Sequence, residues 1–350
     1  MDVKLNRRTS KTSSLQAIVL ILLVLLVQSN ALAQQTTEAE IVAADATVRE
    51  VFSGGETQLE GPAMSPDGML YFCDLPLTNG VPGKAGIIWR LNPMTGESSV
   101  FRSPSGMANG LTFDAAGNLI ACEGADFGGR RVTKTDMKTG KSIIIAGLYQ
   151  GKSFNAPNDV TVDEQGRVYF TDPRYIGHEP LEQHVMGVYR IDKDGSVHLV
   201  AANVAKPNGI AISPDQKTLY VTNCDQPGDG NSRFLPDDLK AVRPTGEGFI
   251  LAYSLLPDGS LQLRGKFIDY GTNCPDGLAI DREGNLYIGV WERLEVYSPQ
   301  GKKIAEIKVP EAVNMCFGRG RFSKILFIAG GKSIYAIDVK KEGYHLPFKK

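Results

Sequence analysis

A short segment recurs six times along this chain and constrains the fold more than any other feature. Each copy has an oxygen-bearing polar side chain, a following residue that is usually glycine, and then two short apolar strands separated by a turn. The residues after the polar position recur at intervals of 49, 49, 50, 68 and 38: Gly61, Gly110, Asp159, Gly209, Gly277 and Met315. Self-similarity near 50 residues is typical of propellers and other repeat arrays.

Each repeat predicts a four-stranded meander. In the first copy, a Ser-Pro-Asp-Gly turn at residues 65–68 parts two strands, and residues 87–91 and 98–102 read as two more. Four strands in this order make one propeller blade. The sequence therefore predicts an all-β fold, a six-bladed β-propeller with four-stranded blades. Residues 42–52 read as a strand that completes the last blade and closes the ring.

The N-terminus has the pattern of an export signal. Four basic residues precede an apolar run at residues 17–27, and Ala-Leu-Ala follows at residues 31–33. We interpret residues 1–33 as a signal peptide, with an uncleaved N-terminal anchor as the alternative. Residues 34–350 then form a single propeller domain, with an insertion loop at about residues 225–248. The expected location is periplasmic or secreted.

Charge and cysteine content limit the partners. The chain has 38 Lys and Arg against 39 Asp and Glu, so neither nucleic acid nor an anionic membrane surface is an expected partner. No membrane contact is expected beyond the signal peptide, and we expect a monomer or a weak homo-oligomer. Five cysteines without a Cys-x-x-Cys motif indicate neither a disulfide framework nor a zinc site. We interpret Cys73 and Cys122 as small buried strand residues.

The polar position of the repeat predicts a metal site. The innermost strand of each blade lines the central channel of a propeller, so equivalent positions lie on one ring. Here they are all carboxylates or carboxamides: Glu60, Asn109, Asn158, Asn208, Asp276 and Asn314. Buried polar groups are costly unless paired, and oxygen donors without His or thiolate suit Ca²⁺, or less well Mg²⁺ or Mn²⁺. The alternative is that Asn-Gly and Asp-Gly are simply turn formers.

A second set of equivalent residues ends the second strand of each repeat, and four of its six members are polar. Its members are Asp74, Glu123, Asp172, Asn223, Val290 and Gly330. In an antiparallel hairpin the end of the second strand lies beside the start of the first. We expect the polar members to hydrogen-bond around the ring or to contact the substrate. The alternative is ordinary surface polarity at strand ends.

An ordered set of motifs resembles a known family. The set comprises Glu60-Gly61-Pro62, Pro157-Asn158-Asp159, Thr171-Asp172-Pro173, Pro207-Asn208-Gly209 and Pro275-Asp276-Gly277. It is similar to that of the gluconolactonase / senescence-marker-protein / luciferin-regenerating-enzyme family, and most similar to the bacterial gluconolactonase branch. The resemblance spans about residues 50–337. It implies a six-bladed propeller with one axial divalent metal, often calcium, that hydrolyses lactones; relatives act on phosphotriesters or related esters.

The resemblance also assigns roles to residues. It implies Glu60, Asn208 and Asp276 as metal ligands, Asn158 as a further ligand or substrate contact, and Asp276 as the general base. We further expect substrate contacts from Asn109, Asn158, Asp159 and Asp172. Part of the family has an arginine that grips sugar hydroxyls where this chain has Ala156. Lys152, Arg174 or the loop at residues 225–248 are possible substitutes.

The predicted function is metal-dependent hydrolysis of a small-molecule lactone. Water would attack the carbonyl while a carboxylate accepts its proton. The sequence has no Gly-x-Ser-x-Gly element, which argues against a covalent serine mechanism. The alternatives are a noncatalytic ligand-binding propeller with a structural calcium, or an esterase or phosphotriesterase that uses the same site. A strictosidine-synthase-like propeller fits the acidic ring less well.

Overall fold

A computed structural model describes residues 40–76, 86–225 and 246–348. The regular secondary structure of these residues is mainly antiparallel β-strand, with a 3-10 turn at Gly320–Phe322 and helical residues at 40–41. The expected signal peptide and most of the expected insertion loop, residues 226–245, lie outside them. No helix in the described ranges is long and apolar enough to cross a membrane.

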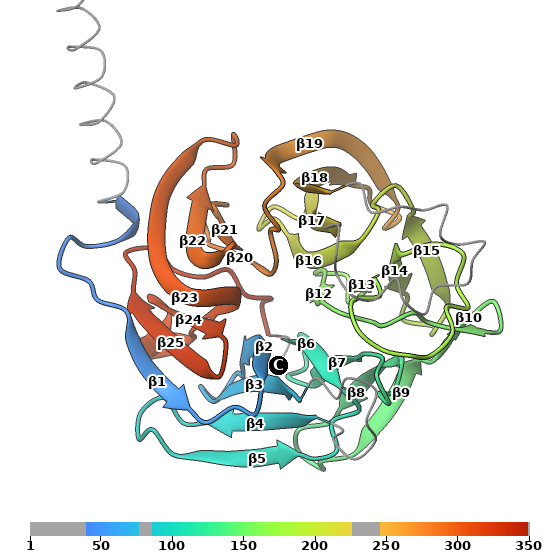
Figure 1. The fold of residues 1–350 in the computed structure, drawn as a ribbon, viewed down its shortest axis with the longest axis horizontal. Helices are drawn as coiled ribbons and strands as arrows, with labels where there is room; N and C mark the ends of the chain where they lie inside the picture. Colours follow the sequence, from blue (N-terminus) through green and yellow to red (C-terminus); the bar gives the residue numbers. More distant parts are fainter. Residues whose placement is uncertain (1–39, 77–85, 226–245, 349–350) are drawn as a thin grey trace, which may run out of the picture.

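The strands form small sheets arranged in a ring (Figure 1). Four sheets have four strands each, joined in meander order. The first contains β2 (Gln58–Met64), β3 (Leu70–Leu75), β4 (Ile87–Leu91) and β5 (Ser98–Arg102); the second contains β6 (Ala108–Phe113), β7 (Leu119–Glu123), β8 (Arg131–Thr135) and β9 (Ser142–Ala146). The third contains β12 (Val160–Val162), β13 (Val168–Asp172), β14 (Gly187–Ile191) and β15 (Val197–Ala201); the fourth contains β16 (Pro207–Ile212), β17 (Thr218–Asp225), β18 (Glu247–Leu255) and β19 (Leu261–Gly271). A short hairpin of β10 (Leu148–Tyr149) and β11 (Lys152–Ser153) precedes the third sheet.

The remaining strands form one seven-stranded sheet in the order β1-β25-β24-β23-β22-β21-β20. Its members are β20 (Leu278–Ile280), β21 (Leu286–Gly289), β22 (Trp291–Tyr297), β23 (Lys303–Phe317), β24 (Ile325–Gly330), β25 (Ser333–Asp338) and β1 (Arg49–Ser53). The first part of β23 pairs with β22 and its last part with β24, and Glu311 between them has a positive φ of 49°. Two repeats therefore share one long strand, which bends at Glu311 instead of breaking into two.

The N-terminal strand joins the last strand of the chain, as expected for ring closure. β1 pairs with β25 from Arg49 to Ser53. The expected start at residue 42 was wrong: Val42 forms only an isolated bridge to Val339, and a turn at residues 44–45 separates it from β1. The closing strand is shorter than predicted, but it covers the edge of β25.

The hydrophobic core lies between neighbouring sheets. Tyr71 and Cys73 of β3 pack against Leu111 and Phe113 of β6, and other clusters fill the interfaces further around the ring. Both Cys73 and Cys122 are fully buried in strands, as predicted. Figure 1 shows β2, β6, β12, β16 and β20 nearest the centre of the ring, with later strands of each sheet further out. This arrangement brings the starts of the repeats together.

Candidate active site

Five of the six repeat positions line one cavity of about 520 Å³. Three lie on the innermost strands β2, β6 and β16, and two lie two residues before β12 and β20: Glu60, Asn109, Asn208, Asn158 and Asp276. Glu60 and Asn208 are buried, each with 7% of its surface exposed. The remaining three are partly exposed. Residues from five repeats thus present oxygen atoms to one space.

The sixth position lies on the other side of this ring of residues. Asn314 of β23 lines a smaller cavity of about 150 Å³, together with Asp159 and the C-terminal residues Tyr344 and His345. The Asn314 side chain nevertheless acts on Glu60, since it lowers the pKa of that carboxyl. Asn314 therefore supports the ring without lining the larger cavity.

The electrostatics of the ring are unfavourable for two bare carboxylates. Burial raises the pKa of Glu60 well above its usual value, and the negative charges of Asp276 and Asp159 raise it further. The Gly61 N–H and Asn314 partly oppose this increase in pKa. Among the described residues no three His, Cys, Asp or Glu side chains cluster as metal ligands. Glu60 and Asp276 therefore supply two acidic donors at the axis. A cation bound there would also need the carboxamide oxygens to complete its coordination shell.

The donor chemistry of this cavity fits a calcium ion. The five repeat positions that line it supply two carboxylates and three carboxamides, which are the hard oxygen donors that Ca²⁺ takes in sixfold or higher coordination. A divalent cation would also offset the mutual repulsion of Glu60 and Asp276. Magnesium, which demands regular octahedral geometry and retains water, fits a carboxamide-rich set less well.

Close backbone packing explains why glycine follows the polar position. A Cβ on Gly61 would collide with the backbone of Asn109, and a Cβ on Gly209 would collide with that of Asp276. The glycines therefore let each innermost strand approach the next repeat at the ring. Turn formation alone does not account for them, since Gly209 lies inside β16.

The second polar set anchors the backbone that leads into the ring. The Asp172 carboxylate accepts hydrogen bonds from the N–H groups of Asn155 and Ala156, both 2.8 Å. Asn223 accepts one from the N–H of Lys206, two residues before Asn208. Asp172 is fully buried and is not a cavity-lining residue. Burial raises the pKa of Asp172 to about 7, although both N–H donors oppose the increase.

Asp159 also lies away from the larger cavity. Its carboxylate accepts hydrogen bonds from its neighbour Val160 at 2.9 Å and from Ile210 of the next sheet at 3.1 Å. Burial raises the pKa of Asp159 to about 6, and these donors partly compensate. Of the four expected substrate contacts, Asn109 and Asn158 therefore line the cavity, whereas Asp159 and Asp172 bind backbone groups around it.

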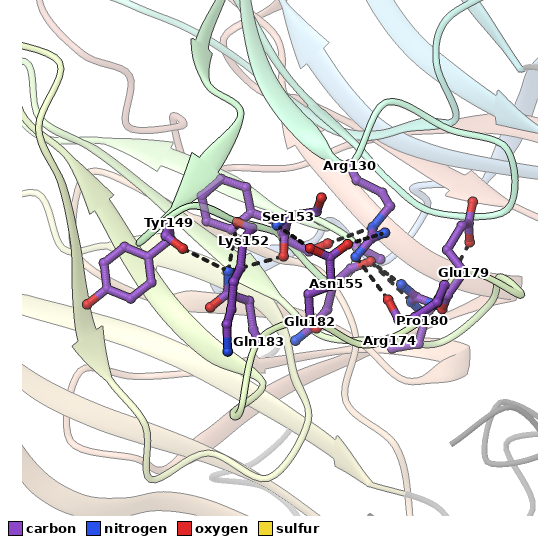
Figure 2. Close-up of polar contacts among 12 residues, drawn as sticks. Arg130, Tyr149, Lys152, Ser153, Asn155, Arg174, Glu179, Pro180, Glu182 and Gln183 are labelled. Atoms are coloured by element: carbon purple, nitrogen blue, oxygen red, sulfur yellow. Dashed lines mark hydrogen bonds and ion pairs between the residues drawn. The ribbon is translucent and has the colours of Figure 1, made fainter. Parts of the chain in front are cut away.

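A polar network holds the segment before Asn158 (Figure 2). Arg130 donates to the Phe154 carbonyl at 2.7 Å, and Arg174 donates twice to the Asn155 carbonyl, at 2.6 and 3.1 Å. Gln183 adds hydrogen bonds to the carbonyls of Lys152 and Ser153. Loops from two neighbouring sheets thus fix the approach to Ala156, Pro157 and Asn158, which all line the cavity.

Two of the cysteines form a disulfide bond, which the sequence analysis did not indicate. Cys224 at the end of β17 is bonded to Cys274, two residues before Asp276, with a Cα–Cα distance of 4.8 Å. Both cysteines line the cavity. The sequence did not indicate this pair because the two cysteines lie 50 residues apart, in different repeats, and meet only through the fold.

Several cavity-lining residues had no signal in the repeat. Tyr175 and Ile176 lie in the connection between β13 and β14, and Trp291 is the first residue of β22. Trp291 is 56% exposed and has a positive φ of 62°, which is unusual for a bulky side chain. In the sequence, Trp291 could have been noticed only as a tryptophan directly after the second strand of the fifth repeat.

Known proteins share this architecture. The family model for the SMP-30/Gluconolactonase/LRE-like region matches residues 59–228 and 240–331. The chain is 30% identical over 324 residues to a gluconolactonase of Zymomonas mobilis, covering 84% of this chain and 82% of that protein. A gluconolactonase structure from Xanthomonas campestris matches with a TM-score of 0.70 at 28% identity, covering 86% of this chain and 92% of the other. Regucalcin from Agrobacterium tumefaciens, described as a calcium-binding protein, shares the fold at a TM-score of 0.66 and 16% identity, covering 87% and 98%. Together with the ordered motifs at the ring, these matches show that the chain belongs to the SMP-30/gluconolactonase/LRE-like family.

Proposed function

We propose that this protein is a metal-dependent hydrolase of small-molecule lactones. The observation that carries the proposal is the cavity itself, into which five repeats present carboxylate or carboxamide groups. The relatives named gluconolactonase and lactonase support lactones as the substrate class. The ring of small sheets is, in this proposal, a six-bladed propeller in which the two parts of β23 serve the fifth and sixth blades.

Glu60, Asn158, Asn208 and Asp276 would hold one divalent cation, with calcium favoured by the oxygen donors and magnesium or manganese as alternatives. When bound, such an ion supplies Lewis-acid polarisation of a carbonyl oxygen. Asn109 and Asn158 would orient the lactone through their amide groups, since both face the cavity. Asp159 and Asp172 would act by positioning the backbone around the ring.

Asp276 would accept the proton of the attacking water. The water oxygen bonds to the lactone carbonyl carbon, the ring C–O bond breaks, and the proton passes to the departing ring oxygen, which leaves a hydroxy acid. Asp276 suits this task because it lines the cavity and is partly exposed, so water can reach it. Glu60 is more deeply buried and suits a ligand better than a base.

We also propose that the protein is exported from the cytoplasm. Residues 1–33 would be a signal peptide, and the protein would act in the periplasm or outside the cell. The Cys224–Cys274 bond supports this location, because structural disulfides persist in oxidising compartments and are rare in the cytosol.

A noncatalytic ligand-binding protein with a structural calcium is the competing function, and ester or phosphotriester hydrolysis is a third possibility. The test is hydrolysis of a lactone panel, of p-nitrophenyl acetate and of paraoxon by chelator-stripped protein, with and without Ca²⁺, Mg²⁺ or Mn²⁺. We expect lactone hydrolysis to return with metal and to be lost in Asp276→Asn. Asp269→Asn, an exposed carboxylate on β19, is the matched control and should retain the activity.

Calcium that raises the melting temperature while all the lactones stay intact would contradict lactonase activity. Hydrolysis of only the ester or the phosphotriester would instead assign the site to that chemistry.

A further inference from the structure

Trp291 forms part of the cavity wall in a conformation that the backbone imposes. It is the first residue of β22 and lies beside the buried Val290. A tight turn fixes it: the Val290 N–H donates to the Arg293 carbonyl and the Glu292 N–H donates to the Val290 carbonyl, both at 2.9 Å. A bulky residue at positive φ is disfavoured, and such outliers concentrate at functional sites. The fold thus keeps a large, half-exposed indole at the cavity.

Other parts of the same wall are apolar. Leu75, Met107, Ile176 and Val290 line the cavity together with Trp291. These side chains cannot hydrogen-bond to hydroxyl groups, and Trp291 offers only its indole N–H. A lactone bearing several hydroxyls would leave some of them unpaired against this wall, which is unfavourable.

The long polar side chains near this wall are already engaged. The Tyr175 hydroxyl donates to the backbone carbonyls of Lys206 and Cys224, at 3.2 and 3.3 Å. The Arg293 guanidinium pairs with Glu295 at 2.8 Å. The Tyr175 hydroxyl proton and the Arg293 Nε are therefore already used within the protein.

Arg174 and Lys152, the expected substitutes for a sugar-binding arginine within the described residues, have other partners. The Arg174 guanidinium binds backbone carbonyls, and the Lys152 ammonium lies 2.9 Å from a ring nitrogen of His184. Neither lines the cavity, and Ala156 occupies the arginine's place in it. In the described part of the chain, hydroxyl-binding groups of the cavity are thus concentrated at the axial ring and at Asn273 and Glu292.

We propose that the lactone taken by this site carries an apolar substituent, aromatic or alkyl, that packs against the indole of Trp291. This inference rests on the proposed lactonase function and narrows its substrate class. Trp291 contacts the substituent and the axial residues contact the lactone ring, so the indole determines specificity while the hydrolytic chemistry is independent of it.

The test compares three δ-lactones that share a ring: δ-valerolactone, its 6-phenyl derivative and glucono-δ-lactone. We expect kcat/KM to be highest for the phenyl compound. Trp291→Gly, which suits the positive φ, should lower kcat/KM for the phenyl lactone about five- to tenfold, the order of one aromatic contact. It should change the value for δ-valerolactone less than twofold. Trp291→Phe should keep the preference, and Ile143→Ala, which trims an exposed apolar residue of β9, should change neither rate.

A binding measurement separates this inference from the proposed function. The chain has two tryptophans, so in Trp89→Phe the fluorescence reports on Trp291 alone. Titration with 6-phenylpiperidin-2-one, the lactam counterpart of the phenyl lactone, should shift this emission, and unsubstituted piperidin-2-one should not.

Hydrolysis of δ-valerolactone with no preference for the phenyl compound, or equal losses on all lactones in Trp291→Gly, would overturn the inference and leave lactonase function intact. Failure to hydrolyse any of the lactones, with no fluorescence response, would overturn both.

Discussion

Replacement of Gly209 by alanine should disturb the ring directly. A Cβ on Gly209 would lie 2.9 Å from the Cα of Gly277 and closer still to the carbonyl oxygen of Asp276. Nonbonded carbon atoms pack at about 3.5–4.0 Å, so the two backbones would have to separate by roughly 0.6–1.1 Å. The φ of Gly209 lies outside the left-handed region, so alanine meets no backbone penalty there and the collision is the main effect.

The expected magnitude combines two opposing terms. Overpacking of this kind costs about 1–3 kcal/mol, whereas alanine in place of glycine at a permitted φ gains about 0.4–1 kcal/mol through the unfolded state. We therefore expect the free energy of unfolding to fall by about 1–2 kcal/mol. Because the separation displaces Asn208 from Asp276, the rate of lactone hydrolysis should fall further, by about 100-fold for a shift near 1 Å.

Urea unfolding and the rate of lactone hydrolysis measure these two effects, and calcium titration of chelator-stripped protein reports the displacement of Asn208 from Asp276. Gly147→Ala is the matched control, because a Cβ there meets only the Ile144 side chain at an ordinary 3.4 Å and φ is again unstrained. If Gly209→Ala and Gly147→Ala have the same free energy of unfolding and the same calcium affinity, close backbone packing at Gly209 does not hold the ring together.

Three further predictions test the surroundings of the ring. Replacing Cys224 and Cys274 by serine should lower the free energy of unfolding in urea by about 2–4 kcal/mol, because the bond joins residues 50 apart; unchanged stability would count against it. Asp172→Ala should lower the free energy of unfolding by about 2–4 kcal/mol in the same assay, because it leaves the N–H groups of Asn155 and Ala156 without their acceptor. It should also weaken calcium binding in a titration, and normal calcium affinity would contradict a positioning role for Asp172. Burial, and then the nearby Arg319 charge, lowers the pKa of His345 to about 4. The unfolded chain therefore binds more protons between pH 6.5 and 4, and the free energy of unfolding should fall by about 2–3 kcal/mol as pH drops through this range. In EDTA, His345→Gln should lose this component, and a pH profile identical to that of the unmodified protein would contradict the assignment.

The repeat in the sequence was sufficient to predict the strands and the positions that meet at the centre. Period-2 alternation and turn residues located β4 and β5 at the expected residues. The continuous β23 was not predictable, because the last repeat is the shortest and a bend at Glu311 replaces the expected break between strands. Local patterns fix strands, but the pairing partner of each half of β23 depends on the closed ring.

The candidate site was also predictable only in part. Glu60 and Asn208 could be predicted because each occupies an equivalent place in its repeat. Asp159 and Asp172 were expected at the substrate, but their orientation depends on which backbone N–H groups the neighbouring loops present. Trp291 had no repeated counterpart, so its place on the cavity wall emerges only from the fold.

Metal-dependent lactone hydrolysis is tested by measuring calcium occupancy and lactone hydrolysis in the same samples. Chelator-stripped protein is titrated with Ca²⁺ by calorimetry, and the hydrolysis rate is recorded by pH-stat at each point. We expect one ion per chain and a hydrolysis rate that rises in proportion to calcium occupancy, and we expect Glu60→Gln to weaken both curves together. A rate that is unchanged between the stripped and the saturated protein would contradict a metal-dependent lactonase at this ring.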